Sequence, residues 1–288
     1  MIKELVIISG KGGTGKTSIS GSFAALSENK VMADCDVDAA DLHIILDHTV
    51  LSDESFSTSR KAVLTPELCI ECGKCLELCR FDAITENFRI KQLSCEGCGV
   101  CAAFCPAGAI KMVDHESGRW FVSDTPKGPL VHACLGMAEG NSGKLVALLR
   151  KKAREIAEEK GYELIIVDGS PGTGCPVIAS VTGASYLLIV TEPTVSGLHD
   201  LKRALELAAH FRVKSGVCVN RADINSEMAS EIEKYCKETG ISFLGTIPYD
   251  KDVTSAQIEG KPVVDHSDGA ASQSIKVLWN KVLNEISE

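Results

Sequence analysis

Glu4-Leu-Val-Ile-Ile-Ser9 leads directly into Gly10-Lys-Gly-Gly-Thr-Gly-Lys-Thr17, and this junction decides the fold. The first segment is a short, apolar, β-branched run of the kind that forms a buried strand. The second fits the phosphate-loop pattern G-x-x-x-x-G-K-[ST], and Ile19, Phe23 and Leu26 follow it at helical spacing. A strand, a glycine-rich loop and a helix in this order predict a nucleotide-binding α/β domain.

The loop is predicted to hold the phosphates of ATP or ADP. Its glycines let backbone N–H groups close around phosphate oxygens without Cβ clashes, and the helix N-terminus adds partial positive charge. We expect Lys16 on the terminal phosphates and the Thr17 hydroxyl on a magnesium ion. The predicted nucleotide-binding residues of the loop are Gly10, Lys11, Gly12, Gly13, Thr14, Gly15, Lys16, Thr17 and Ser18.

The composition bounds the class of protein. With 288 residues, 44% of them hydrophobic, the chain has room for one large domain with a sizeable core and a small module. A formal charge of −9 argues against nucleic acid as the main partner. No secretory signal and no apolar run of about 18 residues is visible, so we expect a cytoplasmic protein without stable membrane insertion.

The cysteines form a local pattern, because eight of the thirteen fall between Cys69 and Cys105. Two runs with spacing C-x2-C-x2-C-x3-C each match the bacterial ferredoxin motif, in which three cysteines hold one 4Fe–4S cluster and the fourth holds the other. Zinc is the alternative, but structural zinc usually uses pairs of cysteines. Arg80 replaces the usual proline after the first run without removing a ligand. The predicted sets are Cys69, Cys72, Cys75 and Cys105 for one cluster, and Cys79, Cys95, Cys98 and Cys101 for the other.

The cysteine-rich segment interrupts the α/β pattern and is therefore predicted to be an insertion. The polar stretch Ser52–Ser59 indicates a turn-like boundary before it. Afterwards Gly128–Leu135 is a plausible strand, and Asn141-Ser-Gly opens a helix to about Lys160. We expect a phosphate-loop ATPase domain of residues 1–55 and 127–288, with a ferredoxin-like domain of residues 56–126 inserted after the second strand.

The position of Lys11, directly after the first glycine of the loop, narrows the choice of phosphate-loop family. A solvated loop lysine is the alternative, but GKGGTGKT resembles the deviant phosphate loop of the MinD/ParA/nitrogenase-iron-protein superfamily. The layout of the whole chain resembles MinD-like ATPases that carry an inserted ferredoxin domain. This resemblance implies a doubly wound, mostly parallel sheet. It also implies a homodimer formed through the nucleotide face, with Lys11 reaching the partner's nucleotide.

The resemblance also assigns roles to residues after four predicted strands. Asp36 matches the aspartate near magnesium and the attacking water, and Asp168 ends the apolar strand that precedes a magnesium-ordering turn. Asn220 matches a residue on the adenine edge, and Pro248 and Asp250 match a turn packed beside the base. Ordinary strand-end turns remain the alternative for all five. The implied catalytic residues are Lys11, Lys16 and Asp36, and the implied magnesium residues are Thr17, Asp36 and Asp168.

The remaining cysteines and histidines are expected to be structural. Cys175 follows Asp168 by seven residues, as a cluster-binding cysteine does in the nitrogenase iron protein, with Cys134 as its possible second ligand. A buried thiol is the favoured reading of Cys175, and the same reading applies to Cys35, Cys134, Cys218 and Cys236. The seven histidines are scattered and show no metal-ligand spacing.

The C-terminal segment is expected to form a helix that docks on the protein's own core. Its apolar residues recur at helical spacing, and its polar face is not basic enough for a membrane-surface helix. The residues of this apolar stripe are Ile275, Leu278, Trp279, Val282, Leu283 and Ile286.

Three functions fit these patterns. The favoured one is a slow, partner-stimulated ATPase that couples nucleotide state to electron transfer to an unidentified redox protein. The second is an ATP-dependent scaffold or carrier that delivers iron–sulfur clusters to an accepting protein. The third is a MinD-like switch with structural clusters. No C-x-x-C lies outside the insertion, which disfavours the carrier.

Overall fold

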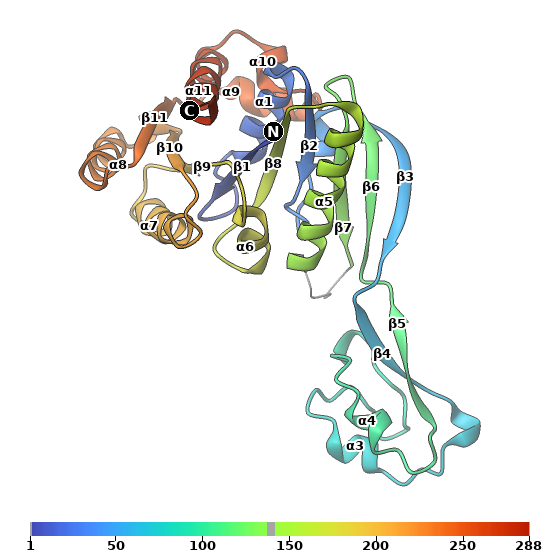
Figure 1. Cartoon of the computed structure of the whole chain (residues 1–288). Helices are drawn as coiled ribbons and strands as arrows, with labels where there is room; N and C mark the ends of the chain where they lie inside the picture. The colour runs from blue at the N-terminus through green and yellow to red at the C-terminus, as the bar shows by residue number, and fades with distance from the viewer. Residues whose placement is uncertain (1, 137–141, 288) are drawn as a thin grey trace. The chain divides into compact units, whose positions relative to one another are not determined.

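The chain folds into two compact units. The computed structural model describes residues 2–136 and 142–287, so Asn141 lies outside the described residues. The helix predicted to run to about Lys160 is confirmed as α5 (Ser142–Lys160). The smaller unit comprises Ser55–Arg119 with residues 135–136, and the larger unit comprises residues 2–54, 120–134 and 142–287 (Figure 1). The domain boundaries expected from the sequence stay a prediction.

A nine-stranded sheet forms the centre of the larger unit, in the order β11-β10-β9-β1-β8-β2-β7-β6-β3. Each pairing from β11 across to β7 is parallel. The predicted doubly wound, mostly parallel sheet is therefore confirmed. The strands are β1 (Lys3–Ser9), β2 (Lys30–Asp34), β3 (Thr49–Phe56), β6 (Gly118–Asp124), β7 (Leu130–Leu135), β8 (Leu164–Pro171), β9 (Tyr186–Thr191), β10 (Ser215–Asn220) and β11 (Ser242–Ile247).

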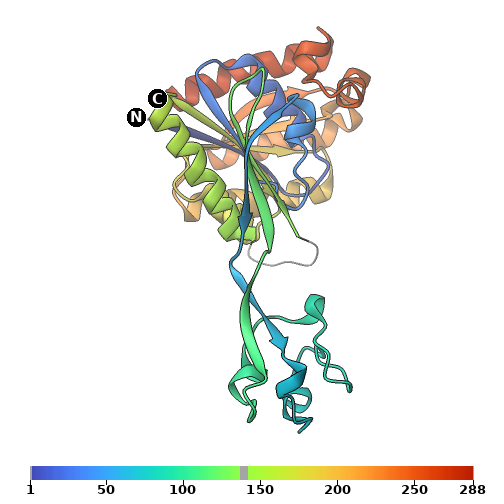
Figure 2. The same cartoon turned by 90° about the vertical axis from the view of Figure 1, so that its right-hand side faces the viewer.

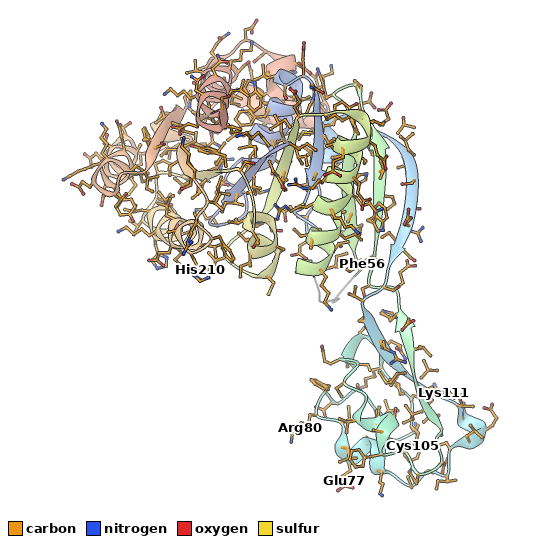
Figure 3. The ribbon with its side chains drawn as sticks, viewed as in Figure 1. Phe56, Glu77, Arg80, Cys105, Lys111 and His210 are labelled. Atoms are coloured by element: carbon orange, nitrogen blue, oxygen red, sulfur yellow. The ribbon has the colours of Figure 1, made fainter. Side chains whose placement is uncertain are left out.

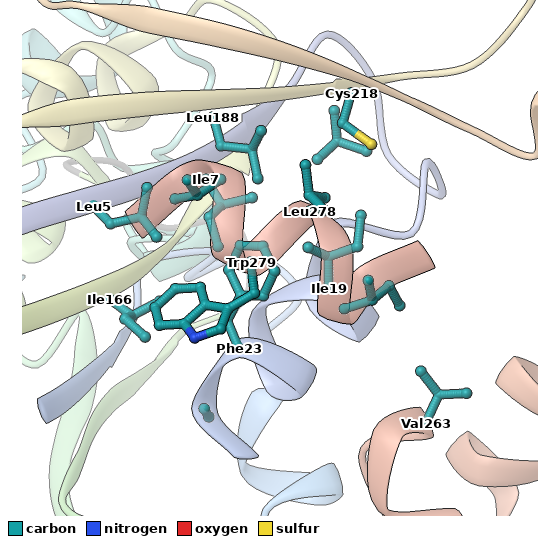
Figure 4. Packing of buried hydrophobic residues seen from close by; sticks show 14 of the residues in the cluster. Leu5, Ile7, Ile19, Phe23, Ile166, Leu188, Cys218, Val263, Leu278 and Trp279 are labelled. Carbon is teal, nitrogen blue, oxygen red and sulfur yellow. The ribbon is translucent and has the colours of Figure 1, made fainter. Parts of the chain in front are cut away.

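Helices cover both faces of this sheet because its inner strands are apolar on both sides. Leu5 and Ile7 of β1 pack in one core with α1 (Lys16–Leu26) and α11 (Ala270–Ser287) (Figure 4). Val6 and Ile8 alternate to the opposite face, where helices pack on β8, β2 and β9 (Figure 2). The helices of that face are α5 (Ser142–Lys160), α6 (Cys175–Val181) and α7 (Val195–His210).

The C-terminal helix α11 docks on the core, as predicted. The rings of Trp279 and Phe23 lie 4.7 Å apart between their centroids, which ties α11 to α1. Leu283 is the exception in the predicted stripe, since 36% of it remains exposed. Among the helices of the described residues, none combines the length and apolar character needed to cross a bilayer. The buried stripe residues are Ile275, Leu278, Trp279, Val282 and Ile286.

The polar stretch Ser52–Ser59 is not a loop, which corrects the expectation from the sequence. It contributes the end of β3 and the beginning of β4 (Ser59–Leu64). The strand β3 lies at the edge of the sheet and is exposed at nearly every position. A strand exposed in this way has no apolar alternation that the sequence could reveal.

The smaller unit repeats one short motif twice. It contains the antiparallel pair β4 and β5 (Ile110–His115) and the short helices α3 (Lys74–Leu78) and α4 (Val100–Ala103). Each helix follows a glycine with positive φ, 74° at Gly73 and 78° at Gly99. Because only glycine adopts this conformation without strain, both glycines fix the turn between the second and third cysteines of each run.

Candidate nucleotide site and cysteine clusters

A cleft of about 720 Å³ opens where β1, β2, β8 and β10 end. This is the edge at which open α/β sheets bind ligands. Of the predicted nucleotide-site residues, Gly10, Lys11 and Asp168 are not among those that line the cleft. Those that line it are Gly12, Gly13, Thr14, Gly15, Lys16, Thr17, Ser18, Asp36, Asn220, Pro248 and Asp250.

The phosphate loop leaves room for a large anion. No heavy atom lies within 4 Å of a Cβ built on Gly12 or Gly13, so the loop backbone faces open space. Directly after it, α1 begins at Lys16. The first N–H groups of a helix lack partners within the helix and carry partial positive charge. The loop and the helix terminus together therefore fit the phosphates of a nucleotide.

A buried charge cluster lies beneath the loop. Lys16 Nζ is 2.9 Å from Asp168 Oδ1 and 3.3 Å from Asp36 Oδ2. Burial opposes the charged form of Lys16, but the fields of Asp168 and Asp36 outweigh it and raise its pKa. Burial raises the pKa of Asp36, and Lys16 opposes that shift. The structure thus brings together Lys16, Asp36 and Asp168, which are distant in the sequence.

Two buried oxygens in this region have no hydrogen-bond partner among the described residues: Thr14 Oγ1 and Asp168 Oδ2. An unpaired buried polar atom is costly unless a ligand or water satisfies it. A hydroxyl beside the loop can donate to a phosphate oxygen, and a free carboxylate oxygen can accept from a metal-bound water. Both orphaned atoms therefore fit a magnesium–nucleotide complex.

Asp34 and Ser20 belong to the same cluster, although the sequence analysis gave them no role. Asp34 is fully buried, and it accepts hydrogen bonds from the N–H groups of Asp36 and Leu42 at 3.2 and 3.0 Å. Burial and the nearby Asp168 raise its pKa well above the ordinary value. Ser20 Oγ donates to Asp168 Oδ1 at 2.9 Å. Asp34 thus holds the backbone segment that carries Asp36. The sequence signal for this role was the position of Asp34 at a strand end, two residues before Asp36.

The three residues predicted at the base also line the cleft, and Asn220 is in contact with the phosphate loop. Asn220 Nδ2 donates to the carbonyl of Thr14 at 2.7 Å. Asp250 caps α9 (Lys251–Ile258) and accepts from the N–H groups of Asp252 and Ala271 at 3.0 and 3.1 Å. These donors lower the pKa of Asp250. Its carboxylate therefore holds two helices in place, and contact with a base stays a prediction for Asn220, Pro248 and Asp250.

The eight cysteines of the smaller unit surround two separate hollows. Figure 3 labels one of these cysteines, Cys105. Its Sγ accepts a hydrogen bond from the N–H group of Ala109 at 3.3 Å. Burial opposes the thiolate form of Cys105, but the surrounding backbone N–H groups together outweigh it and lower the pKa of the thiol. One hollow is lined by Cys69, Cys72, Cys75 and Cys105, and the other by Cys79, Cys95, Cys98 and Cys101.

No group of three or more His, Cys, Asp or Glu side chains in residues 2–136 and 142–287 is arranged to hold a metal ion. The iron–sulfur assignment is therefore not shown by the geometry. A 4Fe–4S cluster makes a different demand, since its four cysteines bind four irons and need not converge on one ion. The donor set, four thiols around each hollow, fits such a cluster in its chemistry.

Outside the smaller unit, two cysteines depart from the expectation. Cys35, Cys218 and Cys236 are fully buried, as predicted, and burial raises the pKa of Cys218 to about 12. Cys134 and Cys175 are exposed, so the reading of both as buried thiols is wrong. Cys175 stands at the first position of α6 behind a glycine-containing turn, where a helix terminus leaves its side chain in solvent.

Three histidines that seemed scattered in the sequence meet in the larger unit. His132 of β7 lies 5.1 Å from His43 and 5.4 Å from His48 between ring centroids, and Phe121 stacks on it at 5.0 Å. His132 Nε2 and Ser123 Oγ share a hydrogen bond of 2.9 Å. Burial lowers the pKa of His132 to about 4. Only the sheet brings these rings together, and no sequence signal could have found them.

Comparison with known proteins places the larger unit in a family. Residues 5–263 match the sequence profile of the CobQ/CobB/MinD/ParA nucleotide binding domain. The chain is 35% identical to an uncharacterized protein of Methanocaldococcus jannaschii, over 98% of this chain and 97% of that protein. It is also 30% identical to an uncharacterized ATP-binding protein of the same organism, over 47% of this chain and 52% of that protein.

Solved structures show the same fold. MinD of Pyrococcus horikoshii, complexed with Mg-ADP, aligns with a TM-score of 0.59 at 17% identity, covering 98% of this chain and 96% of that one. The MinD cell division protein of Aquifex aeolicus aligns with a TM-score of 0.57 at 20% identity, covering 98% and 97%. At such identities the likeness concerns the fold alone.

Proposed function

Because the chain belongs to the CobQ/CobB/MinD/ParA nucleotide-binding family, we propose that it is an ATP-hydrolysing homodimer whose nucleotide state controls electron transfer through two 4Fe–4S clusters. Family membership supports nucleotide binding and, through the deviant loop, ATP hydrolysis. The cysteine hollows support the clusters. The coupling between the two is the central part of the proposal, and it calls for a redox protein as partner.

The cleft geometry supports Mg-ATP as the ligand. Gly12–Ser18 would hold the phosphates. The Lys16 ammonium, which pairs with Asp168 in this structure, would also donate hydrogen bonds to the terminal phosphates. Thr17, Asp36 and Asp168 would hold magnesium and its waters. Asn220, Pro248 and Asp250 would lie along the base. Asp36 would also orient an attacking water, and its position in the cleft lining beside Lys16 supports this role.

The observation that carries the redox part is the sorting of eight cysteines into two sets of four. Each hollow takes three cysteines from one run and one cysteine from the other, which is the ligand exchange of two-cluster ferredoxins. When bound, such clusters supply one-electron redox chemistry. The N–H donor on Cys105 Sγ would stabilise a thiolate at that position.

An anaerobic redox titration tests the proposal. The purified protein would be titrated alone, with Mg-ADP and with Mg and a non-hydrolysable ATP analogue, while the clusters are followed by electron paramagnetic resonance. We expect the analogue to shift a cluster potential by roughly 60 mV or more, which corresponds to about 1.4 kcal/mol for one electron. If the anaerobically purified protein contains no iron, the proposal of two clusters is refuted. Identical curves in all three states would refute control of the potential by the nucleotide.

A specific observation keeps the carrier as the second candidate. Cys134 and Cys175 are exposed thiols in the larger unit, outside both cysteine hollows. Exposed thiols can pass a labile cluster to another protein. If the three titration curves coincide, transfer of iron and sulfide to an apo-ferredoxin would be measured with and without ATP. Transfer that requires ATP would establish the carrier, and failure to transfer would exclude it.

A further inference from the structure

The register of the sheet places Lys11 beside Glu192. In the parallel pair β1–β9, Ser9 lies opposite Val190, so the chain leaves both strands at the same level. Two residues further on, Lys11 Nζ is 3.0 Å from Glu192 Oε2. Gly12–Ser18 line the cleft and Lys11 is not among the lining residues. Lys11 is therefore turned toward Glu192 and not toward the cleft of its own chain.

A second cation binds the same carboxylate from the other side. In the pair β9–β10, Thr191 lies opposite Val219, which brings the residues after β10 beside Glu192. Arg221 Nη1 lies 2.7 Å from Glu192 Oε1. Arg221 has a φ of 54°, which is uncommon for a long side chain and shows that its surroundings hold it there. Glu192 thus binds one cation with each oxygen.

This arrangement makes the contact with Lys11 easy to release. The Glu192 side chain is only 14% exposed, and a carboxylate at that depth is costly to leave unpaired. If Lys11 leaves, Arg221 still neutralises Glu192. If Arg221 were absent, the departure of Lys11 would leave Glu192 without a cation. Arg221 therefore lowers the free energy needed to free Lys11.

We propose that Glu192 is a latch that holds Lys11 within a single subunit, and that Arg221 is the reserve cation that lets the latch open. The inference rests on the proposed function, in which Lys11 reaches the nucleotide of a second copy of the chain. Association of two copies then requires Lys11 to exchange Glu192 for the phosphates of the partner's nucleotide. The terminal phosphate of ATP adds negative charge that ADP lacks, so the latch favours association in the ATP state.

Neighbouring substitutions are expected to act in opposite directions. Glu192→Gln removes the charge that holds Lys11, so two copies should associate about 3- to 5-fold more tightly with Mg and an ATP analogue, measured by sedimentation velocity. Arg221→Gln keeps Glu192 but removes its reserve cation, so association should weaken by a similar factor. Glu206→Gln and Arg212→Gln change the same charges on exposed residues and should leave association unchanged.

A second measurement follows the latch without nucleotide. The rate at which an acetylating reagent modifies the Lys11 amine, measured by peptide mass spectrometry, should rise about 3- to 5-fold in Glu192→Gln and not in Glu206→Gln. Adding Lys11→Ala to Glu192→Gln should cancel the gain in association, because the effect passes through Lys11.

The outcomes separate the inference from the function on which it rests. If the wild-type protein does not associate with any nucleotide, the proposed dimer and the latch both fall. If the wild type associates, and the reagent modifies Lys11 in Glu192→Gln no faster than in the Glu206→Gln control, the latch alone is refuted. Faster modification without tighter association also refutes it. A gain in association in Arg221→Gln would show that Arg221 is no reserve cation.

Discussion

In the larger unit the core consists of aliphatic and aromatic side chains, whereas in the smaller unit cysteines take up much of the interior. The apolar core around Phe23 and Trp279 joins strands β1, β2, β8 and β9 to helices α1 and α11. One hydrophobic cluster of the smaller unit has Ala62, Cys75, Ile84 and Ile110 as its buried members, and four further cysteines pack against them.

This difference predicts different sources of stability. The larger unit buries enough apolar surface to fold by the hydrophobic effect. The smaller unit is too short to bury much, and domains of this kind usually need a metal or cross-link. If iron binds its cysteines, binding and folding of this unit are coupled. We therefore expect that a substitution can abolish iron binding in the smaller unit while nucleotide binding in the larger unit is kept, and that the reverse also holds.

The largest expected effect is that of removing one cysteine from the smaller unit. Cys75→Ser is expected to lower the iron content from about eight to about four atoms per chain or fewer, because one of four ligands is lost. Cys75 is also buried, so the smaller unit should become sensitive to proteolysis. Iron and sulfide assays with limited proteolysis measure both changes, and calorimetry should show unchanged ATP binding.

Cys236→Ala is the matched control for this experiment. Cys236 is fully buried in the larger unit and lines neither hollow, so its removal should leave the iron content unchanged. An unchanged iron content in Cys75→Ser, or a lowered iron content in Cys236→Ala, would contradict the proposal that the smaller unit alone binds the iron.

A smaller effect is expected from Lys16→Ala in the larger unit. Loss of the lysine that would hold the terminal phosphates should weaken ATP binding about 100-fold or more, equivalent to about 2.7 kcal/mol. Iron content should not change. Calorimetry and an iron assay on the same sample test this, with Lys151→Ala on the exposed face of α5 as control.

Lys16→Ala removes both the cation and a hydrogen-bond donor of Asp168. Its melting temperature is therefore compared with that of Lys16→Gln, which also lacks the charge but keeps an amide N–H donor. Retained ATP affinity in a folded Lys16 variant would contradict the proposed site. Loss of iron in both variants would show that the two units do not function separately.

The smallest expected effect is a pH dependence of stability, which arises from the buried His132 in the larger unit. The folded-state pKa of His132 is depressed to about 4, so between that value and about 6.5 the unfolded chain binds more protons. Stability is therefore lost as the pH falls through this window. Urea unfolding should show a loss of about 1–2 kcal/mol between pH 7 and pH 5. Trp120 and Trp279 fluorescence reports it, since both belong to the larger unit.

The double variant His132→Phe with Ser123→Ala is the control for this pH dependence. It keeps a ring between Phe121 and His43 and removes both partners of the buried hydrogen bond. Part of the pH slope should remain, because burial also lowers the pKa of His43. An unchanged slope in this variant would show that His132 is not its source.

Much of the fold was predictable because its inner strands are apolar. The runs that became β1, β2, β8, β9 and β10 are buried on both faces, so each appears as a continuous apolar segment. The strands β3 and β4 were missed because neither follows the usual alternation: β3 exposes Val50 and Leu51, and β4 buries Lys61. Whether a residue of an edge strand is buried depends on what packs beside that strand, and the strand's own composition carries little information about this.

The candidate site divides in a similar way. The phosphate loop, Asp36, Asp168 and the cysteine runs were identified from the sequence because their chemistry demands residue types at fixed local spacing. Asp34 and Glu192 were missed, although each stands at or just after the end of a predicted strand. The contact of Asp250 with the N–H group of Ala271 joins residues far apart in the chain, and local sequence gives no sign of it.

The sequence by itself determined a nucleotide-binding α/β chain with eight cysteines in two runs, because loop conformation and ligand spacing are properties of consecutive residues. Only the tertiary structure decided which histidines stack and which carboxylate binds Lys11. Those contacts depend on strand order and register, which arise from packing across the whole sheet. A lysine and a glutamate 181 positions apart meet only because β1 and β9 are neighbours in the same register.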